Sequence, residues 1–225
     1  MNPGINVEKA RFNMVQQQVR PWDVLDQDIL DLLYVVHREE FVPEAYRAHA
    51  FSDIEIPLSR DLASCERMWA PRVEARVLQE LAVKKPDRVL EIGTGSGHFA
   101  ALLAHRAQHV CSVEINPGLA AMGSANLARC GVDNVTVEQG DGARGWSRGA
   151  PYDVIVLTGS TPVLPDAFLN ELRVGGRLFA IVGDPPVMAA RLVTCTAEGA
   201  FLQRDLFETC FPPLRNALQP ARFQF

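Results

Sequence analysis

Apolar runs of strand length alternate with helical patterns in the part of the chain that follows Pro86. The predicted strands are Arg88–Ile92, Val110–Glu114, Val135–Gln139, Tyr152–Thr158 and Arg177–Val182. Between most of them, apolar residues recur at helical spacing and predict the helices Phe99–Arg106, Leu119–Cys130 and Asp166–Leu172. Strands that alternate with helices predict an α/β fold with a Rossmann-like, doubly wound, mostly parallel sheet covered on both faces.

The N-terminal part has a different pattern, which predicts a helical extension. Its apolar residues at helical spacing are Phe12, Val15, Val19, Leu25, Ile29, Leu32, Leu33 and Val36. Pro21 divides them into two runs, because a proline removes a backbone donor from a helix. The stretch from Ser52 to Pro71 has no clear period, which is typical of a lid or a binding loop.

The C-terminal part predicts an antiparallel hairpin. Met188–Thr196 and Phe201–Phe211 match the pattern of two strands, and Glu198-Gly199 between them is a turn signal. We therefore expect an N-terminal helical segment with a substrate or lid loop over residues 1–72. An α/β core is expected over residues 73–225, and the two parts should form one compact unit.

Composition and charge limit the kinds of partner that the protein is expected to bind. The 225 residues carry a formal net charge of -5, which argues against a general affinity for nucleic acid. The first residues lack a basic segment followed by an apolar run, and no apolar run reaches the length of a membrane span. We expect a cytoplasmic protein with no membrane segment.

The cysteines predict neither disulfides nor a metal site. They are Cys65, Cys111, Cys130, Cys195 and Cys210. No C-x-x-C pair occurs, and no Cys/His cluster has zinc spacing. We expect reduced, buried thiols, as is usual in a cytoplasmic protein.

The strongest chemical signal is the run Val89-Leu90-Glu91-Ile92-Gly93-Thr94-Gly95-Ser96-Gly97, in which a predicted strand leads into three alternate glycines. Glycines allow a backbone to pass close to a ligand, and the helix that follows offers free N–H groups. Dinucleotide sites usually carry G-x-G-x-x-G, whose third glycine would stand at His98. Because S-adenosylmethionine has no pyrophosphate, the G-x-G-x-G spacing and the acidic Glu91 suit it better. A tight turn without a ligand is the plain alternative.

Two further acidic residues follow predicted strands. Glu114 stands 17 residues after Gly97, close to the spacing at which a carboxylate meets ribose hydroxyls, and Ile115 follows it. Gly140-Asp141-Gly142 follows the next strand, where the Asp can accept from an adenine amino group, although alone it is also a turn signal. Strand carboxyl ends are where open α/β sheets bind ligands, so we expect these groups to meet.

Several motifs occur in the order found in one family. They are Met14–Arg20 (MVQQQVR), Arg38–Pro43 (REEFVP), Ala50–Asp53, Ile56–Leu58, Gly140–Gly142 with Gly145-Trp146, Pro151–Asp153 and Val174–Leu178. On these motifs the chain resembles the protein-L-isoaspartate O-methyltransferase family over most of its length. The resemblance implies methyl transfer from S-adenosylmethionine to the carboxylate of isoaspartyl residues in damaged proteins or peptides, which leaves S-adenosylhomocysteine. A carboxylate is already a nucleophile at neutral pH, so no general base is expected.

The chain departs from the family pattern at Cys65–Pro71, which stands where the family has G-Q-T-I-S-Q-P. No hydroxyl occupies the expected positions, and Ser59 and Ser64 are weak candidates to replace it. Trp69, at the place of the serine, is either a packing residue or a cover for the adenosine or an aromatic acceptor. Arg67 is either a surface charge or a partner for a substrate carboxylate.

Other candidate site residues come from the resemblance. His98 replaces the aromatic residue usual after the glycines and is expected to line the site. Thr158 and Ser160 belong to the small-residue loop Thr158–Pro165, which borders the methyl-transfer point in such folds.

Three functions stay open on the sequence. The first is the isoaspartyl methyltransferase itself. The second is the same enzyme class acting on a different, small-molecule acceptor, because the segment Cys65–Pro71 is altered. The third is a non-catalytic cofactor-binding protein that presents its helices or altered loop to a partner.

Overall fold

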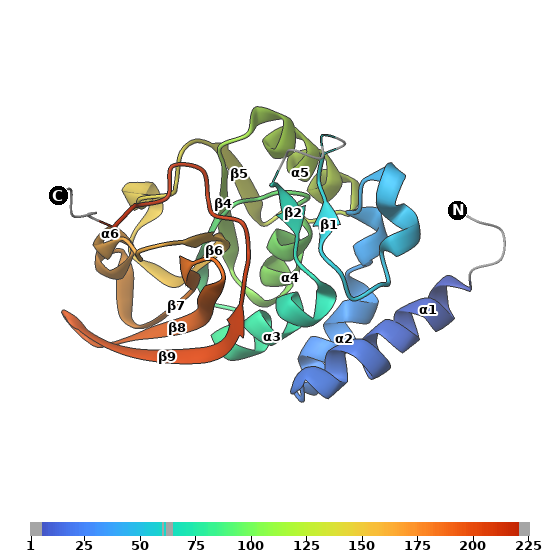
Figure 1. Cartoon of the computed structure of the whole chain (residues 1–225), viewed down its shortest axis with the longest axis horizontal. Coiled ribbons are helices and arrows are strands. Elements are labelled where there is room, and N and C mark those ends of the chain that lie inside the picture. The colour runs from blue at the N-terminus through green and yellow to red at the C-terminus, as the bar shows by residue number, and fades with distance from the viewer. Residues whose placement is uncertain (1–5, 60, 62–64, 221–225) are drawn as a thin grey trace.

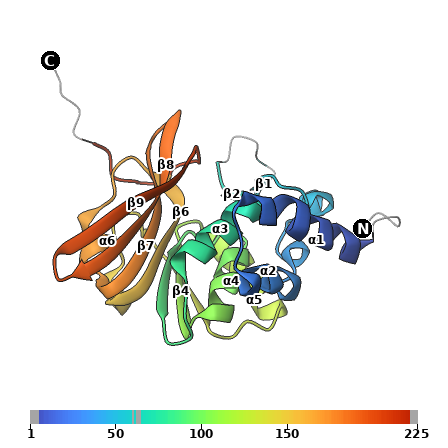
Figure 2. The ribbon, with the colours of Figure 1, turned by 90° about the horizontal axis from the view of Figure 1, so that it is seen from below.

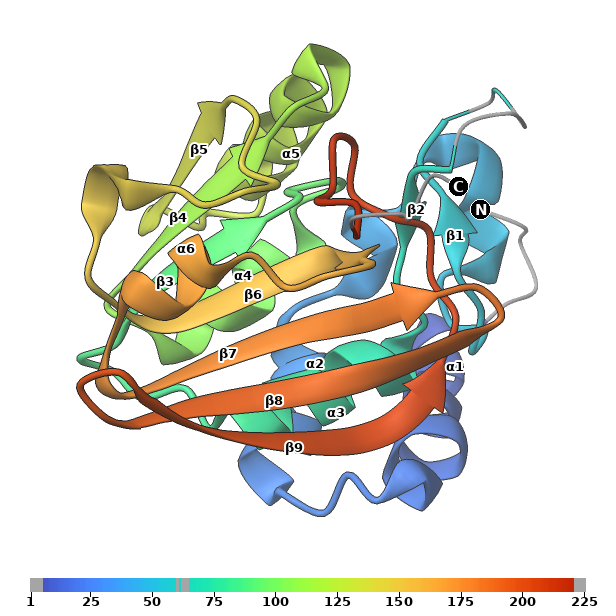
Figure 3. The ribbon, with the colours of Figure 1, turned by 60° about the vertical axis from the view of Figure 1, so that its left-hand side comes forward.

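The computed structural model describes residues 6–59, 61 and 65–220 and contains one large sheet. The sheet has seven strands in the order β5-β4-β3-β6-β7-β8-β9. The strands are β3 (Arg88–Ile92), β4 (His109–Glu114), β5 (Val135–Gln139), β6 (Tyr152–Thr161), β7 (Leu172–Asp184), β8 (Val187–Ala197) and β9 (Ala200–Thr209). The first five pair in parallel, and β8 and β9 add an antiparallel extension (Figures 1 and 3). The predicted fold class is confirmed.

The helices of the α/β core lie mainly on one face of the sheet. That face carries α3 (Pro71–Leu81), α4 (His98–Arg106) and α5 (Pro117–Arg129), while α6 (Asp166–Asn170) lies on the other (Figure 3). Pro71 and Pro117 each open a helix, where the missing N–H costs nothing. Among the described residues, the face of α6 has only this short helix and the single turn η5 (Ser147–Gly149), so its cover is thinner than expected.

The N-terminal segment packs outside α3 and α4 (Figure 2). It consists of α1 (Val7–Asn13), η1 (Met14–Val19), η2 (Arg20–Trp22), α2 (Gln27–Val35), η3 (Arg38–Glu40) and η4 (Glu44–His49). The prediction that Phe12 and Leu25 lie on a buried helix face is wrong, because their side chains are 53% and 71% exposed. Leu25 lies between η2 and α2, outside any helix, and η1 after Phe12 is a π-helix, so the segment does not follow one regular helical period.

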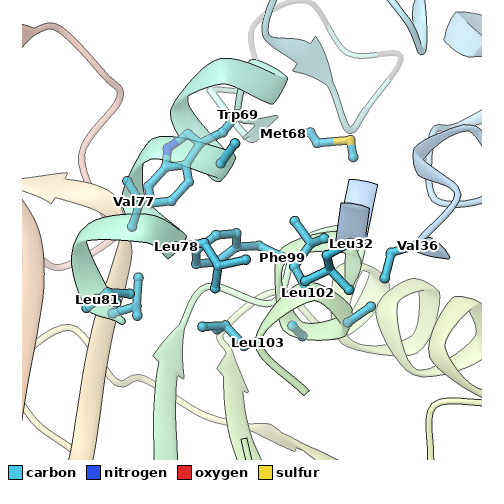
Figure 4. Packing of buried hydrophobic residues seen from close by; sticks show 14 of the residues in the cluster. Leu32, Val36, Met68, Trp69, Val77, Leu78, Leu81, Phe99, Leu102 and Leu103 are labelled. Carbon is cyan, nitrogen blue, oxygen red and sulfur yellow. The ribbon is translucent and has the colours of Figure 1, made fainter. Parts of the chain in front are cut away.

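One hydrophobic cluster joins the N-terminal helices to the α/β core. Leu32 and Val36 of the N-terminal segment lie near Leu78 of α3 and Leu102 of α4, with Phe99 at the same level and Trp69 above (Figure 4). The N-terminal helices and the α/β core therefore share one continuous set of apolar contacts, which buries the apolar faces of these helices. The division at residues 72 and 73 stays a prediction.

A short antiparallel pair holds the irregular stretch between η4 and α3. In it β1 (Ile56–Pro57) pairs with β2 (Arg67–Met68), and Leu58 N–H donates to the carbonyl of Glu66 over 3.0 Å. This pair places Arg67 and the residues after it beside the carboxyl edge of the sheet (Figure 3).

Candidate functional site

A cleft lies at the carboxyl ends of the parallel strands, and we call it the main cleft. It encloses about 800 Å³, including space open to solvent. The predicted site residues that line it are Arg67, Gly93, Gly95, Glu114, Ile115, Asp141, Gly142 and Thr158. These residues come from the ends of β3, β4, β5 and β6 and from β2, so the strand order brings them together as expected for an open α/β sheet.

The glycine loop packs closely against its neighbours. Gly93 has φ +101°, and a Cβ there would stand 2.2 Å from the hydroxyl oxygen of Thr158. The Thr158 hydroxyl lies 2.9 Å from the carbonyl oxygen of Ile92 and 2.8 Å from that of Gly93. Its single hydrogen is shared between these two acceptors. Gly97 has φ +83° and packs against Gly123 of α5 rather than lining the cleft. The glycines therefore allow the loop to fit between β6 and α5.

Glu114 is held rigidly at the end of β4. One carboxylate oxygen, Oε2, accepts from Gly95 N–H over 3.0 Å, and the other, Oε1, accepts from Asn116 N–H over 2.9 Å. The side chain is buried apart from the part that lines the cleft. Each carboxylate oxygen accepts up to two hydrogen bonds, so both keep capacity for a diol.

Asp141 is fixed at another edge of the main cleft. Its Oδ1 accepts from Ala143 N–H over 3.1 Å, and its Oδ2 accepts from the side-chain amide of Asn216 over 2.8 Å. Gly142 beside it has no room for a side chain, because a Cβ would stand 2.7 Å from Ile92 Cδ1. The carboxylate thus faces the cleft with a set orientation.

Glu91 does not line the main cleft, contrary to the expected contact with a ligand amino group. Its side chain is fully buried, and Oε2 accepts a hydrogen bond from the Ser112 hydroxyl. Removal from water raises the pKa of this carboxyl to about 8, so its protonated form dominates at neutral pH. Strand β3 is central and buried on both faces, so alternation along it does not show which side chains reach a ligand.

A smaller cavity of about 310 Å³ adjoins the main cleft, and we call it the side pocket. Its lining is Leu58, Arg67, Met68, Trp69, Glu74, Gly93, Thr94, Gly95, Ser96, Phe99 and Thr158. Arg67 and Thr158 are among the residues that line both spaces. A ligand in the main cleft and a second ligand in the side pocket would therefore meet beside these two residues.

Trp69 is a packing residue. Its ring is 4% exposed and meets Phe99, Phe179 and Phe211 edge to face, with centroid distances of 5.2, 5.8 and 6.0 Å (Figure 4). Such edge contacts add to the burial energy and fix the ring. The alternative in which the indole covers adenosine is therefore wrong. Trp69 forms part of the wall of the side pocket instead.

Arg67 is exposed, and among the described residues its guanidinium forms no close hydrogen bond or ion pair, although its charge favours the ionised form of the nearby carboxyl of Glu55. The strand pairing of β2 with β1 fixes its backbone, since Arg67 pairs with Pro57. A cationic side chain that lines both cavities suits an anionic group.

The remaining hydroxyl candidates do not face the main cleft. Ser59 lines neither cavity, and its hydroxyl oxygen accepts from Asp61 N–H over 3.0 Å. Ser64 lies outside the described residues. Thr94 and Ser96 line only the side pocket, and the Thr94 hydroxyl is 2.6 Å from that of Ser112.

Ser160 and His98 are both buried away from the two cavities, which corrects the expectation for each. Strand β6 continues past the predicted end, and its register with β7 shifts between Val156 and Ser160. The residues within this bulge include Thr158, which reaches the cleft, whereas the Ser160 hydroxyl donates to the carbonyl of Phe211 over 2.7 Å. His98 Nδ1 lies 3.0 Å from Oε1 of Glu74.

No local pattern in the sequence predicts the C-terminal wall of the main cleft. Phe211–Arg215 lines the cleft, and its backbone is tied to Ser160 of β6 through Pro212 and Leu214 (Figure 3). The guanidinium of Arg215 forms an ion pair with Glu66, next to Arg67. The C-terminal segment and the residues around β2 thus enclose the cleft together.

The sequence model of the family described as Protein-L-isoaspartate(D-aspartate) O-methyltransferase (PCMT) matches residues 10–219. The chain belongs to this family.

Individual relatives agree. Protein-L-isoaspartate O-methyltransferase 1 of Syntrophobacter fumaroxidans is 37% identical over 87% of this chain and 89% of its own. A solved protein-L-isoaspartate O-methyltransferase matches with a TM-score of 0.77 at 24% identity, over 92% of this chain and 65% of that longer one. A Plasmodium falciparum structure described as this enzyme, in complex with S-adenosyl-L-homocysteine, matches with a TM-score of 0.76 at 18% identity, over 93% of this chain and 98% of its own. The two structures show the shared fold.

The cysteines are free, but the expectation that all are buried is wrong. Cys65, Cys130 and Cys210 are exposed, Cys111 is half-buried and Cys195 is buried. Burial and the nearby Glu138 raise the pKa of the Cys111 thiol to about 11, which makes it a poor nucleophile. Within the described part of the chain, no helix is both long and apolar enough to cross a membrane.

Proposed function

We infer that this protein transfers the methyl group of S-adenosylmethionine to the carboxylate of L-isoaspartyl residues in damaged proteins or peptides, in the cytoplasm. Family membership supports the reaction class. The observation that carries the inference for this chain is the junction of the two cavities at Arg67 and Thr158. One cavity has the acidic groups for a nucleoside, and the other has a cationic side chain for a carboxylate.

The main cleft fits the cofactor. Glu114 would accept from the ribose diol, because its oxygens keep free acceptor capacity after binding two backbone N–H groups. Asp141, which Ala143 and Asn216 hold in place, would accept from the adenine amino group. The loop Gly93–Gly97, between the main cleft and the side pocket, would receive the amino-acid end of the cofactor.

The side pocket fits the acceptor. Arg67 pairs with the isoaspartyl carboxylate and orients one oxygen toward the junction of the cavities. Apolar walls formed by Met68, Trp69 and Phe99 remove water from this oxygen. In this chain, the Arg67 guanidinium thus binds the acceptor in place of the hydroxyl groups of the family motif.

Little further chemistry is required of the side chains. When bound, S-adenosylmethionine supplies an electrophilic methyl group, which bonds to the carboxylate oxygen as the carbon–sulfur electron pair passes to sulfur. No proton moves, so alignment of the two partners is the main contribution of the protein. The one carboxylate in the side pocket, Glu74, is paired with Arg38 and His98 and need not act as a base.

The other two functions have less support. The small-molecule alternative was based on the altered segment Cys65–Pro71 and on a pocket closed by Trp69. The Trp69 ring is held by Phe99, Phe179 and Phe211 as part of the wall of the side pocket and does not close over it. A non-catalytic role is not what the matching family, described as a methyltransferase, indicates. Turnover measurements separate these alternatives from the proposed reaction.

The test is methylation of a synthetic peptide with one L-isoaspartyl residue, using S-adenosylmethionine labelled in its methyl group. We expect a base-labile methyl ester on this peptide and none on the matched L-aspartyl peptide. Calorimetry with S-adenosylhomocysteine checks that the protein used binds cofactor. Tight cofactor binding with no ester on the isoaspartyl peptide would refute the proposal, and turnover on another acceptor would replace it.

A further inference from the structure

Three buried polar side chains meet beside the side pocket. Arg38 comes from η3, Glu74 from α3 and His98 from α4, and each is at most 2% exposed. The carboxylate of Glu74 joins the other two, because Oε2 pairs with Arg38 and Oε1 lies 3.0 Å from His98 Nδ1. Arg38 also donates to the carbonyl of Trp69 over 2.6 Å.

A buried ion pair of this kind does not by itself explain stability. Burial lowers the pKa of the Arg38 guanidinium below its ordinary value, and the carboxylate of Glu74 opposes that effect. Apolar residues of similar volume often stabilise a core as well as a buried ion pair does. The position of the Arg38–Glu74 pair in the fold is therefore the better guide to its role.

That place lies between the two halves of the site. Through Arg38, the pair holds the backbone of Trp69, which directly follows the Arg67–Met68 strand of the side pocket. Through His98, it holds the first residue of α4, which directly follows the glycine loop. Glu74 itself lines the side pocket. One carboxylate thus contacts both the acceptor side and the cofactor side.

The state of His98 follows from these contacts. Glu74 accepts, so His98 carries its hydrogen on Nδ1 and is the donor of this bond. Its Nε2 is buried and has no hydrogen-bond partner among the described residues, and its ring lies edge to face with Phe41 at 5.3 Å. A hydrocarbon ring could fill this volume, but it would leave Oε1 of Glu74 without its donor.

We propose that Glu74 is a positioning residue that sets the distance between the segment Arg67–Ala70 and the glycine loop, acting through Arg38 and His98. The inference rests on the proposed function, because the segment it positions carries the guanidinium that receives the acceptor. Loss of the charge on Glu74 shifts Trp69 and, with it, Arg67. The acceptor is then misaligned, while the ribose and adenine contacts at Glu114 and Asp141 stay intact.

The first variant is Glu74→Gln, which keeps the shape and removes the counter-charge of Arg38. Its matched control is Glu39→Gln, because Glu39 pairs with Arg11 in another buried ion pair that touches neither cavity. We expect Glu74→Gln to raise the KM for the isoaspartyl peptide about tenfold, as misplacement of a reactant does, with the KM for S-adenosylmethionine changed less than about twofold. Glu39→Gln should leave both KM values unchanged.

The second variant, Arg38→Met/Glu74→Met/His98→Phe, keeps the test decisive if Glu74→Gln folds poorly. It replaces the polar cluster by apolar side chains of similar size, so we expect a folded protein whose acceptor KM is still raised. If either folded variant has a normal acceptor KM, or if both cofactor and acceptor KM values rise together, Glu74 is only a structural residue.

Hydrogen exchange gives a readout that does not depend on turnover. In Glu74→Gln we expect faster exchange of the backbone amides of residues 66–70, and in Glu39→Gln unchanged exchange there. If wild type makes no ester on the isoaspartyl peptide, the proposed function fails, and exchange in this segment still decides the positioning role. Equal exchange in the two variants would overturn that role.

Discussion

Arg215 and Glu66 form an ion pair that joins the C-terminal segment to the residues next to β2 across the main cleft. Glu66 also accepts from the side-chain amide of Asn116 over 2.9 Å, at the start of α5. Three segments that are distant in the sequence therefore meet at one carboxylate on the rim of the cleft. Both Glu66 and Arg215 line the cleft in which we place the cofactor.

Breaking the rim contact should weaken retention of the cofactor. We expect Arg215→Gln to speed dissociation of S-adenosylhomocysteine by up to about fivefold, because a partly exposed ion pair contributes roughly 1 kcal/mol or less. The Arg215 side chain is 57% exposed, so the melting temperature should hardly change. Stopped-flow measurement of the dissociation rate checks this.

The control for Arg215→Gln is Arg191→Gln. Arg191 pairs with Asp205 between β8 and β9, away from the cleft, and the pair is exposed to a similar degree. An equal increase in the dissociation rate in both variants would mean that the rim contact has no specific effect on the cofactor.

Removal of the charge at Glu114 should cost cofactor affinity. In Glu114→Gln, an amide nitrogen replaces one of two oxygens that each accept a backbone N–H, so one bond is lost and the diol loses an ionic acceptor. We expect the Kd for S-adenosylhomocysteine to rise roughly 10- to 100-fold, the range for hydrogen bonds to charged groups. Calorimetry measures it.

Glu138→Gln is the comparison for that experiment. Glu138 lies on the neighbouring strand β5 and pairs with Arg148 outside the main cleft, so its loss should leave the Kd unchanged. A normal Kd in Glu114→Gln would contradict the placement of the ribose.

The strands of the cofactor half could be predicted closely from the sequence. β3 and β5 begin and end where the apolar runs do, and Glu114 ends β4 as expected. Short runs rich in apolar and β-branched residues mark these strands locally, and the carboxyl end is set by chain direction alone. The position of Glu114 at the cleft then follows from strand order.

The remaining features depend on contacts between distant segments. Glu91 belongs to the expected motif, yet its side chain packs with Ser112 because β3 is covered on both faces. The wall formed by Phe211–Arg215 depends on hydrogen bonds to Ser160, which no local pattern encodes. From the sequence, Trp69 is equally compatible with a cover over a ligand and with a packing residue. Three phenylalanine rings from distant parts of the chain surround it in the structure and decide for packing.

A side chain at Gly93 should affect both folding and binding. An added Cβ would stand 2.2 Å from the Thr158 hydroxyl oxygen, and φ is +101°. Gly175 has a similar backbone, with φ +82°, but nothing lies within 4 Å of a Cβ there. We expect Gly175→Ala to cost roughly 1–2 kcal/mol of unfolding free energy from backbone strain alone.

Gly93→Ala should cost more than Gly175→Ala, because collision with Thr158 adds to the strain, and it should also weaken binding of S-adenosylhomocysteine. Urea unfolding and calorimetry on both variants measure the two effects. Equal losses of stability, with unchanged affinity in both, would show that the loop has more room than its contacts indicate.

The buried carboxyl of Glu91 should make stability depend on pH. Burial raises its pKa to about 8 in the folded protein, from the ordinary 4.5. Between these values the folded state holds a proton that the unfolded state has released, so its contribution to stability is complete below pH 4.5 and is lost as pH rises toward 8. The expected slope is about -1.4 kcal/mol per pH unit within that window.

Glu91→Gln isolates this effect, since the amide resembles the protonated acid and its oxygen still accepts from Ser112. Groups that titrate in both proteins cancel in the comparison. We expect the unfolding free energy of the variant, relative to wild type, to rise by a few kcal/mol between pH 5 and pH 8.5, as measured by urea unfolding. A difference that stays constant over this range would mean that Glu91 is ionised in the folded protein.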